Sequence, residues 1–176
     1  MAELKGSKTE KNLAAAFAGE SQARNKYTFF AKVARNEGFH YLADIFEETA
    51  LHETQHAKEL FKLLGGISDT KTNLKAAIAG EDHETVSMYP EFAKTAEEEG
   101  LKEAANLFKQ IAKVEAFHRD RYKKLLEMVE KQGLYKREQK TTWQCDKCGF
   151  VVEGNEPPPK CPLCKHPTEY FTPSAL

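Results

Sequence analysis

Cysteine is absent from the first 144 residues of this 176-residue chain, and all four cysteines lie between Cys145 and Cys164. Disulfides that stabilise a whole fold would not cluster in this way, so the cluster indicates metal binding in a reducing compartment. No segment approaches the roughly 18 uncharged apolar residues of a membrane-spanning helix. The formal net charge is only -1, which gives no electrostatic reason to bind nucleic acid or an anionic membrane.

Proline is also scarce in most of the chain. Residues 8–133 contain one proline, Pro90, whereas residues 142–176 contain the other six and Trp143. The first five residues, Met1 to Lys5, have no apolar core or cleavage pattern of a secretory signal, so we expect a cytoplasmic protein. The change in composition predicts a helical domain over residues 1–134, a linker over 135–141 and a small module over 142–176.

The helical domain is rich in Ala, Glu, Lys and Leu, and its apolar residues recur at steps of three and four. Glycine is common directly after a helix, and it occurs at each expected helix end: Gly38, Gly65, Gly66, Gly100 and Gly133. The pattern predicts four helices, over residues 8–37, 39–65, 73–99 and 101–132.

The two halves of this domain repeat each other. Residues 12–20 match residues 73–81 at an offset of 61, and from Tyr27 and Tyr89 onward the offset is 62. The domain is therefore a duplicated helical hairpin with an expected pseudo-two-fold axis. One extra residue inside a helix is commonly accommodated by a π-helical turn. The shift in offset predicts such a turn in the third helix near residues 82–88.

Each repeat carries one Glu on its first helix and Glu-x-x-His on its second. The two sets are Glu20 with Glu53 and His56, and Glu81 with Glu115 and His118. A spacing of three places the Glu and the His on one helix face. Two such sets form the ligand pattern of bundles that bind two iron or manganese ions. The alternative is that these are solvated glutamates on charged helices.

Three further groups lie near this pattern. Glu84 follows Glu81 by three residues, and it is either an extra ligand or a surface residue. Tyr27 and Tyr89 are repeat mates that either border the site or serve as core aromatics. Four other histidines are predicted not to bind metal: His40, His52, His83 and His166.

The small module contains two Cys-x-x-Cys knuckles separated by 12 residues. Their four sulfurs are Cys145, Cys148, Cys161 and Cys164. Two knuckles form a tetrahedral thiolate site that suits either zinc or a single iron, and a zinc ribbon is the first expectation from this motif alone. A module this small depends on its metal to fold. Its aromatic residues are predicted to form a small apolar cluster: Trp143, Phe150, Tyr170 and Phe171.

The two motifs together resemble the rubrerythrins over nearly the whole chain. The resemblance implies a mainly α fold, in which a ferritin-like four-helix bundle with a di-iron site precedes a rubredoxin-like domain with one iron. It also implies a peroxidase that reduces hydrogen peroxide to water and protects against oxidative stress in the cytoplasm, with no organic cofactor. One departure is Lys165, where a second knuckle often has glycine, so the local turn there is in question.

The resemblance assigns a role to each ligand. Glu53 and Glu115 would bridge the irons, and Glu20 would bind one of them, with Glu84 and His56 as alternative ligands. Glu81 and His118 would hold the other iron. Electrons would come from a rubredoxin or a reduced-nicotinamide-dependent reductase and pass through the four-cysteine iron. Transfer between subunits would require a homodimer.

In ferritin-like bundles the third helix runs antiparallel to the first, so the connection between the second and third helices must cross the length of the bundle. About residues 66–72 form this connection here, and they are short for that distance. This favours a domain-swapped dimer in which two helices of each chain complete the site of the other. Two competing functions are considered. One is a ferritin-like ferroxidase or iron-handling protein, and the other is a binding module in which a zinc ribbon recruits a partner.

Overall fold

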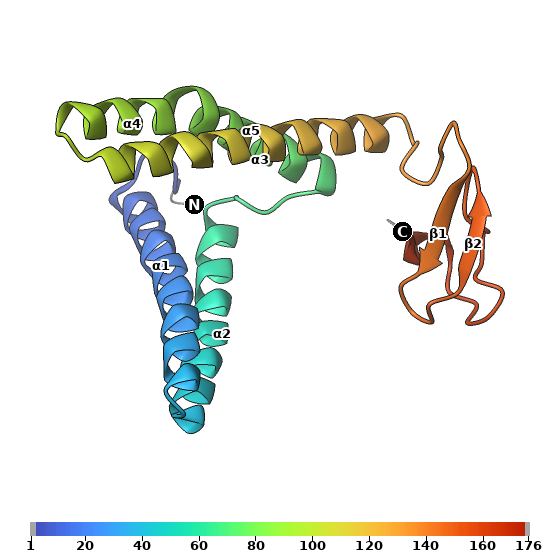
Figure 1. Ribbon diagram of the computed structural model, residues 1–176, viewed down its shortest axis with the longest axis horizontal. Coiled ribbons are helices and arrows are strands. Elements are labelled where there is room, and N and C mark those ends of the chain that lie inside the picture. Colours follow the sequence, from blue (N-terminus) through green and yellow to red (C-terminus); the bar gives the residue numbers. More distant parts are fainter. Residues whose placement is uncertain (1–2, 175–176) are drawn as a thin grey trace. The chain divides into compact units, whose positions relative to one another are not determined.

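The computed structural model describes residues 3–174, so the outer ends of the two predicted domains lie outside the described residues. The helical part contains α1 (Lys8–Asn36), α2 (His40–Leu63), α3 (Thr70–His83), the π-helical segment η1 (Glu84–Met88), α4 (Tyr89–Glu98) and α5 (Lys102–Glu130). Because α3, η1 and α4 follow one another without a break, they form one long helix (Figure 1). The four predicted helices are confirmed. None of the described helices has the length and apolar character needed to cross a bilayer.

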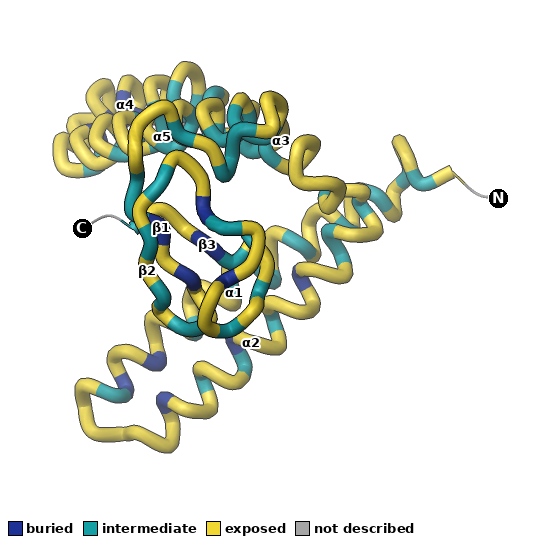
Figure 2. The backbone as a smooth tube through the Cα atoms, turned by 90° about the vertical axis from the view of Figure 1, so that its right-hand side faces the viewer, coloured by how far each residue is buried: buried dark blue, intermediate teal, exposed yellow. Residues whose placement is uncertain are grey.

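The chain divides into two compact units, up to Asp69 and from Thr70 onward. The first unit is the α1/α2 hairpin, and the second contains the hairpin of α3, η1, α4 and α5 together with the small module. In the first hairpin the buried residues are small: Ala31, Ala34, Ala43, Ala50 and Ala57. Small side chains let the two backbones approach closely. Most of each hairpin is exposed or only partly buried (Figure 2), so each has an apolar face that needs another helical layer.

Glycine ends three of the helices as predicted. Gly38, Gly65 and Gly100 have φ angles of 86°, 72° and 78°, which a side chain would disfavour. After the first of them, Phe39 N–H donates to Ala34 C=O at 2.8 Å and closes the last turn. Gly133 also lies near a helix end, three residues after Glu130, and its N–H donates to Met128 C=O at 2.8 Å. Gln132 takes the left-handed conformation at the end of α5 (φ 52°), and Gly133 is the next residue.

The π-helical turn is confirmed at Glu84–Met88, where Tyr89 N–H donates to Glu84 C=O five residues earlier. Eight residues separate Glu81 from Tyr89, whereas seven separate Glu20 from Tyr27. The wider turn takes up the additional residue, so the second tyrosine keeps the position of the first. Pro90 follows directly, where it needs no N–H partner in the interrupted hydrogen-bond ladder.

The aromatic contacts confirm the duplication. Three rings of the first hairpin have centroid separations of 6.3, 6.2 and 5.7 Å: Tyr27, Phe30 and Phe46. Their repeat mates in the second hairpin have separations of 6.4, 6.1 and 5.7 Å: Tyr89, Phe92 and Phe108. Both tyrosines therefore belong to partly exposed aromatic clusters of the same geometry.

The small module has an antiparallel sheet of three strands in the order β2-β1-β3, made of β1 (Thr141–Cys145), β2 (Val151–Gly154) and β3 (Phe171–Pro173). Trp143 and Phe171 are buried with two of the cysteines, and Phe150 and Tyr170 pack against them, so the predicted cluster is confirmed. Tyr135 packs on the same core. The Arg137 guanidinium lies 5.1 Å from the Trp143 ring centroid, so the segment expected to be a linker is held against the module.

Candidate metal centres

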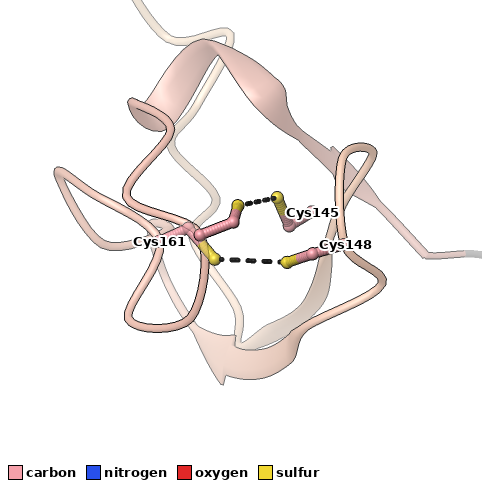
Figure 3. Close-up of side chains that lie close together, drawn as sticks. Cys145, Cys148 and Cys161 are labelled. Carbon is pink, nitrogen blue, oxygen red and sulfur yellow. Dashed lines mark hydrogen bonds between the residues drawn. The ribbon is translucent and has the colours of Figure 1, made fainter.

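The four cysteine sulfurs converge between the two knuckles (Figure 3). Cys145 Sγ lies 3.6 Å from Cys164 Sγ, and Cys148 Sγ lies 3.6 Å from Cys161 Sγ. A disulfide would require about 2 Å. A tetrahedron with metal–sulfur bonds of about 2.3 Å has edges of about 3.8 Å. The separations therefore fit four thiolates around one metal ion.

The knuckles repeat each other in backbone as well as in sequence. Gly149 N–H donates to Cys145 C=O at 2.8 Å, and Lys165 N–H donates to Cys161 C=O at 3.0 Å. Gly149 has a φ of 75° and Lys165 a φ of 64°. The second knuckle therefore makes the glycine-type turn with a lysine, in a conformation that costs a side chain roughly 1 kcal/mol. The departure at Lys165 leaves the turn intact.

The thiols influence one another before any metal binds. A backbone N–H of Phe150 favours the Cys148 thiolate, but burial and the neighbouring sulfurs outweigh it and raise the pKa of Cys148 to about 12. Burial disfavours the Cys161 thiolate, yet backbone N–H groups and neighbouring thiols lower the pKa of Cys161 to about 6. The cluster therefore favours a thiolate at Cys161, the form of cysteine that binds a metal ion.

In the first hairpin, Glu20 on α1 faces Glu53 and His56 on α2. His56 Nδ1 lies 3.1 Å from Glu53 Oε2 and 3.8 Å from Glu20 Oε2. The second hairpin repeats this set. His118 Nδ1 lies 2.7 Å from Glu115 Oε2 and 3.7 Å from Glu81 Oε2. Ligands at about 2.0–2.2 Å from one ion lie up to about 4.4 Å apart, so each half-set can share a metal ion.

Close contact between carboxyl groups shifts pKa values in both half-sets. Contact with Glu53 is the main cause that raises the pKa of Glu20, and the same contact lowers the pKa of Glu53. Burial is the main cause that raises the pKa of Glu81, followed by contact with Glu115. The close approach of the carboxyls thus disfavours the charged form of Glu20 and Glu81, and a bound cation would offset that cost.

Glu84 begins the π-helical segment and is partly buried. It is not within the close group formed by Glu81, Glu115 and His118. Its negative charge nevertheless contributes to raising the pKa of Glu81, and burial followed by the Glu84 charge raises the pKa of Tyr89. Glu84 therefore acts electrostatically on the second half-set, and the Tyr89 hydroxyl keeps its proton.

The histidines expected not to bind metal differ in their surroundings. His40, His52 and His83 are exposed on the helices. His166 is partly buried, and its Nδ1 lies 3.3 Å from Cys164 Sγ. Its ring packs edge-on against Tyr170 with centroids 4.8 Å apart. A hydrogen bond to a ligand sulfur is one of the levers that set a metal–thiolate potential.

Sequence analysis missed an ion pair beside the second half-set. Arg119, next to His118, donates to Asp82, next to Glu81, at 3.1 Å across the hairpin. Their repeat mates in the first hairpin are Ala57 and Ser21. The pair could have been found by comparing the two repeats. At these two positions beside the ligands, the first repeat has uncharged residues and the second has two opposite charges.

A helical hairpin duplicated around Glu and Glu-x-x-His, joined to a four-cysteine module, defines a class of two-centre iron protein. The comparisons agree. The family model for rubrerythrin matches residues 11–126, and the model for the rubrerythrin rubredoxin-like domain matches residues 143–172. The chain belongs to the rubrerythrin family, which consists generally of oxidoreductases.

Two curated relatives match over almost the full chain. A rubrerythrin of Porphyromonas gingivalis is 50% identical, with 97% of this chain and 92% of the relative covered. A rubrerythrin of Nitratidesulfovibrio vulgaris is 47% identical, with 97% and 96% covered. A solved structure titled as the partially reduced state of nigerythrin is 32% identical, with 96% and 87% covered and a TM-score of 0.38. Because both family models match and both kinds of ligand group are present, iron is the metal of both centres, as the resemblance implied, rather than the zinc that the cysteine motif alone suggested.

Proposed function

We propose that this protein is a di-iron peroxidase that reduces hydrogen peroxide to two molecules of water, with electrons relayed through the four-cysteine centre. The reaction consumes two electrons and two protons for each peroxide. The observation that supports it most is the presence of two matched carboxylate–histidine half-sets on the same chain as a thiolate centre. A covalently attached electron carrier suits a catalyst that must be reduced again after each turnover.

The bound irons would supply the two electrons that cleave the O–O bond. In this proposal the chain's own groups hold and position the reactants. Glu53 and Glu115 would each contribute to holding both metal ions, Glu20 would hold one ion, and Glu81 and His118 would hold the other. His56 and Glu84 would serve as alternative ligands to the ion that Glu20 holds. The Tyr89 hydroxyl, whose pKa is raised by burial and by the charge of Glu84, would donate a hydrogen bond to a ligand carboxylate.

The proposed setting is the cytoplasm, with a rubredoxin or a reduced-nicotinamide-dependent reductase as the electron donor. The four cysteines support a reducing compartment, because they are free thiols whose sulfurs are too far apart for disulfides. The proposed role is protection against peroxide.

The test is anaerobic rapid mixing of the fully reduced, iron-loaded protein with one equivalent of hydrogen peroxide, followed by visible absorption. We expect fast oxidation of the bundle irons and then growth of the red ferric–thiolate band. No reaction with peroxide, combined with oxygen-driven uptake of further iron, would instead indicate a ferroxidase.

We further propose a homodimer in which α1 and α2 of one chain complete the site with α3, η1, α4 and α5 of the other. In a ferritin-like bundle the third helix runs parallel to the second, so the chain must return along the bundle between them. From Glu53 to the end of α2 is ten residues, and from the start of α3 to Glu81 is eleven, together about 31 Å of helix axis. The seven steps from Leu63 to Thr70 reach at most about 25 Å.

Exposed apolar residues on both hairpins support this exchange, because each hairpin needs a second one to cover it. They include Phe30, Leu42 and Ile45 on the first hairpin and Phe92, Leu107 and Val114 on the second. Light scattering combined with iron analysis tests the proposal. We expect a dimer with four bundle irons. A monomer that retains two bundle irons in solution would exclude the exchange.

A further inference from the structure

An ion pair joins α3 to α5 directly beside the second half-set. Arg119 follows His118 on α5, and Asp82 follows Glu81 on α3. Arg119 Nη1 donates to Asp82 Oδ1 at 3.1 Å across the hairpin. Successive residues of a helix are about 100° apart, so each partner lies one step around its helix from a ligand, on the side where the two helices meet. The pair therefore limits how far α5 can rotate relative to α3 at the level of the ligands.

The guanidinium of Arg119 is held by two acceptors. Besides the bond to Asp82, Arg119 Nε donates to Asp120 Oδ1 at 2.9 Å. The Arg119 side chain is 19% exposed, so most of it is covered by its neighbours. A guanidinium is planar and its N–H groups have fixed directions, so bonds to two carboxylates leave it little freedom to turn. The ion pair therefore has a more defined geometry than a pair between two mobile surface side chains.

The first hairpin lacks this restraint at the matching positions. The repeat mate of Arg119 is Ala57, which is 8% exposed, and that of Asp82 is Ser21. Ser21 Oγ donates to Phe17 C=O at 2.7 Å, so its hydrogen bond stays within α1. An alanine and such a serine can pack closely, but neither carries a charge that would tie α1 to α2. The two half-sets thus share their ligands and differ in what lies beside them.

The contribution of this pair to folding stability is expected to be small. The Asp82 side chain is 47% exposed, and an ion pair with an exposed partner is weakened by water and by the entropy cost of ordering it. A second ion pair, Lys75 Nζ with Glu130 Oε1 at 3.6 Å, joins the same helices near the start of α3 and the end of α5. The hairpin therefore does not depend on Arg119 to hold its helices together, and the effect of the pair is local, on the ligands next to it.

We propose that the Arg119–Asp82 ion pair is a positioning device that keeps His118 and Glu81 turned toward the same metal ion. This inference rests on the proposed function, in which these two ligands hold one iron. The pair acts through the backbone of the ligands that precede its two members, so neither Arg119 nor Asp82 needs to bind metal or peroxide. The other half-set, in which His56 would alternate with another ligand, lacks this restraint.

The first test follows anaerobic release of ferrous ions from the reduced, iron-loaded protein to the chelator ferrozine. The four-cysteine iron is counted separately, from its ferric–thiolate band after reoxidation. We expect Asp82→Asn and Arg119→Gln to lose bundle iron about tenfold faster than wild type, the lower end of the effect of removing an outer partner of a metal ligand. The matched control, Lys75→Gln, breaks the other ion pair between the same helices and should release iron at the wild-type rate. Equal rates for Asp82→Asn and the control, slow or fast, would overturn the proposal.

The second test exchanges the two charges. Asp82→Arg places two cations side by side and should release iron fastest, whereas Asp82→Arg/Arg119→Asp restores an attraction and should bring the rate back to within about threefold of wild type. Arg119→Lys keeps the charge but loses the planar set of donors, so it should fall between wild type and Arg119→Gln. If the exchanged variant releases iron as fast as Asp82→Asn, pairing of charges does not position the ligands and the proposal is wrong.

The third test observes the two ligand histidines by proton NMR of the diferrous protein. A ring N–H proton of a histidine bound to high-spin ferrous iron is shifted far from the ordinary range and exchanges with water. We expect one of the two signals to exchange about tenfold faster in Asp82→Asn while the other keeps its rate, and the melting temperature to fall by only about a few degrees. Equal behaviour of the two signals, with or without a large fall in melting temperature, would mean a merely structural role and overturn the proposal.

None of these measurements uses peroxide, so they separate this proposal from the peroxidase proposal. If the variants lose iron as expected but wild type never reacts with peroxide, the peroxidase proposal fails while the positioning role stands. If wild type reduces peroxide and the variants release iron like wild type, the positioning proposal fails alone.

Discussion

The two hairpins carry the same half-set of ligands and the same trio of aromatic rings, yet they differ in ways that affect the site. The second has one additional residue, accommodated as a π-helical turn, and with it Glu84. It also has the Arg119–Asp82 ion pair where the first has Ala57 and Ser21. The two copies therefore share the ligand face, whereas the π-helical turn, Glu84 and the ion pair occur in the second copy.

These differences suggest that the two halves do different work. The His118 side chain is 33% exposed and is flanked by Arg119, whose ion pair joins α5 to α3. The His56 side chain is 60% exposed and has no such clamp beside it. The proposed alternation of His56 and Glu84 would need a fixed ligand in one half of the site and a more mobile ligand in the other. The comparison therefore favours the second hairpin as the rigid half of the site.

The largest predicted effect comes from disabling the two halves separately. Glu53→Gln and Glu115→Gln each remove one proposed bridging carboxylate, so each variant alone should lose bundle iron and at least about 100-fold in peroxide turnover. In an exchanged dimer, co-expression of the two variants creates mixed dimers with one site that carries both lesions and one intact site. If about half of the dimers are mixed and one of the two sites in each mixed dimer is intact, about a quarter of all sites are intact. We therefore expect about a quarter of wild-type turnover.

Glu48→Gln, an exposed change on the same helix as Glu53, serves as the control and should retain full iron and turnover. Iron content is measured alongside turnover in every sample. If the co-expressed pair recovers nothing while both variants still dimerise, each chain builds its own site and the proposed exchange is wrong.

A second prediction makes the second hairpin resemble the first. Deleting Val86, which is 59% exposed in η1, while changing Pro90 to Thr, its repeat mate Thr28, should give a regular helix. Glu81 and Tyr89 would remain on one face, seven residues apart, and Glu84 would stay three residues after Glu81 but come four residues before Tyr89 in place of five. We expect iron binding to survive and turnover to fall about 10-fold or more, because a misplaced ligand is costly in a geometrically demanding site.

Pro90→Thr without the deletion is the control, and it should behave like the wild type. Glu84→Ala in the original helix should match the deletion variant in turnover. If the deletion variant keeps full activity, the π-helical turn only preserves the helix face and does not position Glu84.

The repeat made much of this structure predictable. The one-residue shift in offset located the π-helical turn, and Gly38, Gly65 and Gly100 located three helix ends. Gly133 also lies near a helix end, but there Gln132, a residue with a side chain, takes the left-handed conformation that glycine usually adopts. Lys165 likewise takes the left-handed conformation although it has a side chain, so its turn could not be predicted from a glycine. The contact of Arg137 with Trp143 depends on how two segments pack, and no local pattern predicts it; the Arg119–Asp82 pair can be found only by comparing the two repeats.

The smallest predicted effect concerns pH and the metal-free protein. The pKa of Glu81 is raised, mainly by burial, so the folded state holds this proton more tightly than the unfolded chain. The stability that this group contributes is present below its ordinary value of 4.5 and is lost as pH rises through its folded pKa. Glutamine cannot ionise, so metal-free Glu81→Gln should melt a few degrees above wild type at pH 7, with the gain gone near pH 4.

Glu20→Gln should gain less, because the Glu20 side chain is 31% exposed against 20% for Glu81. Glu53→Gln should instead lose stability above pH 4.5, since the pKa of Glu53 is lowered. Thermal melts of the three variants across this pH range decide the matter. Equal shifts for Glu20→Gln and Glu81→Gln would mean that burial does not distinguish the two halves.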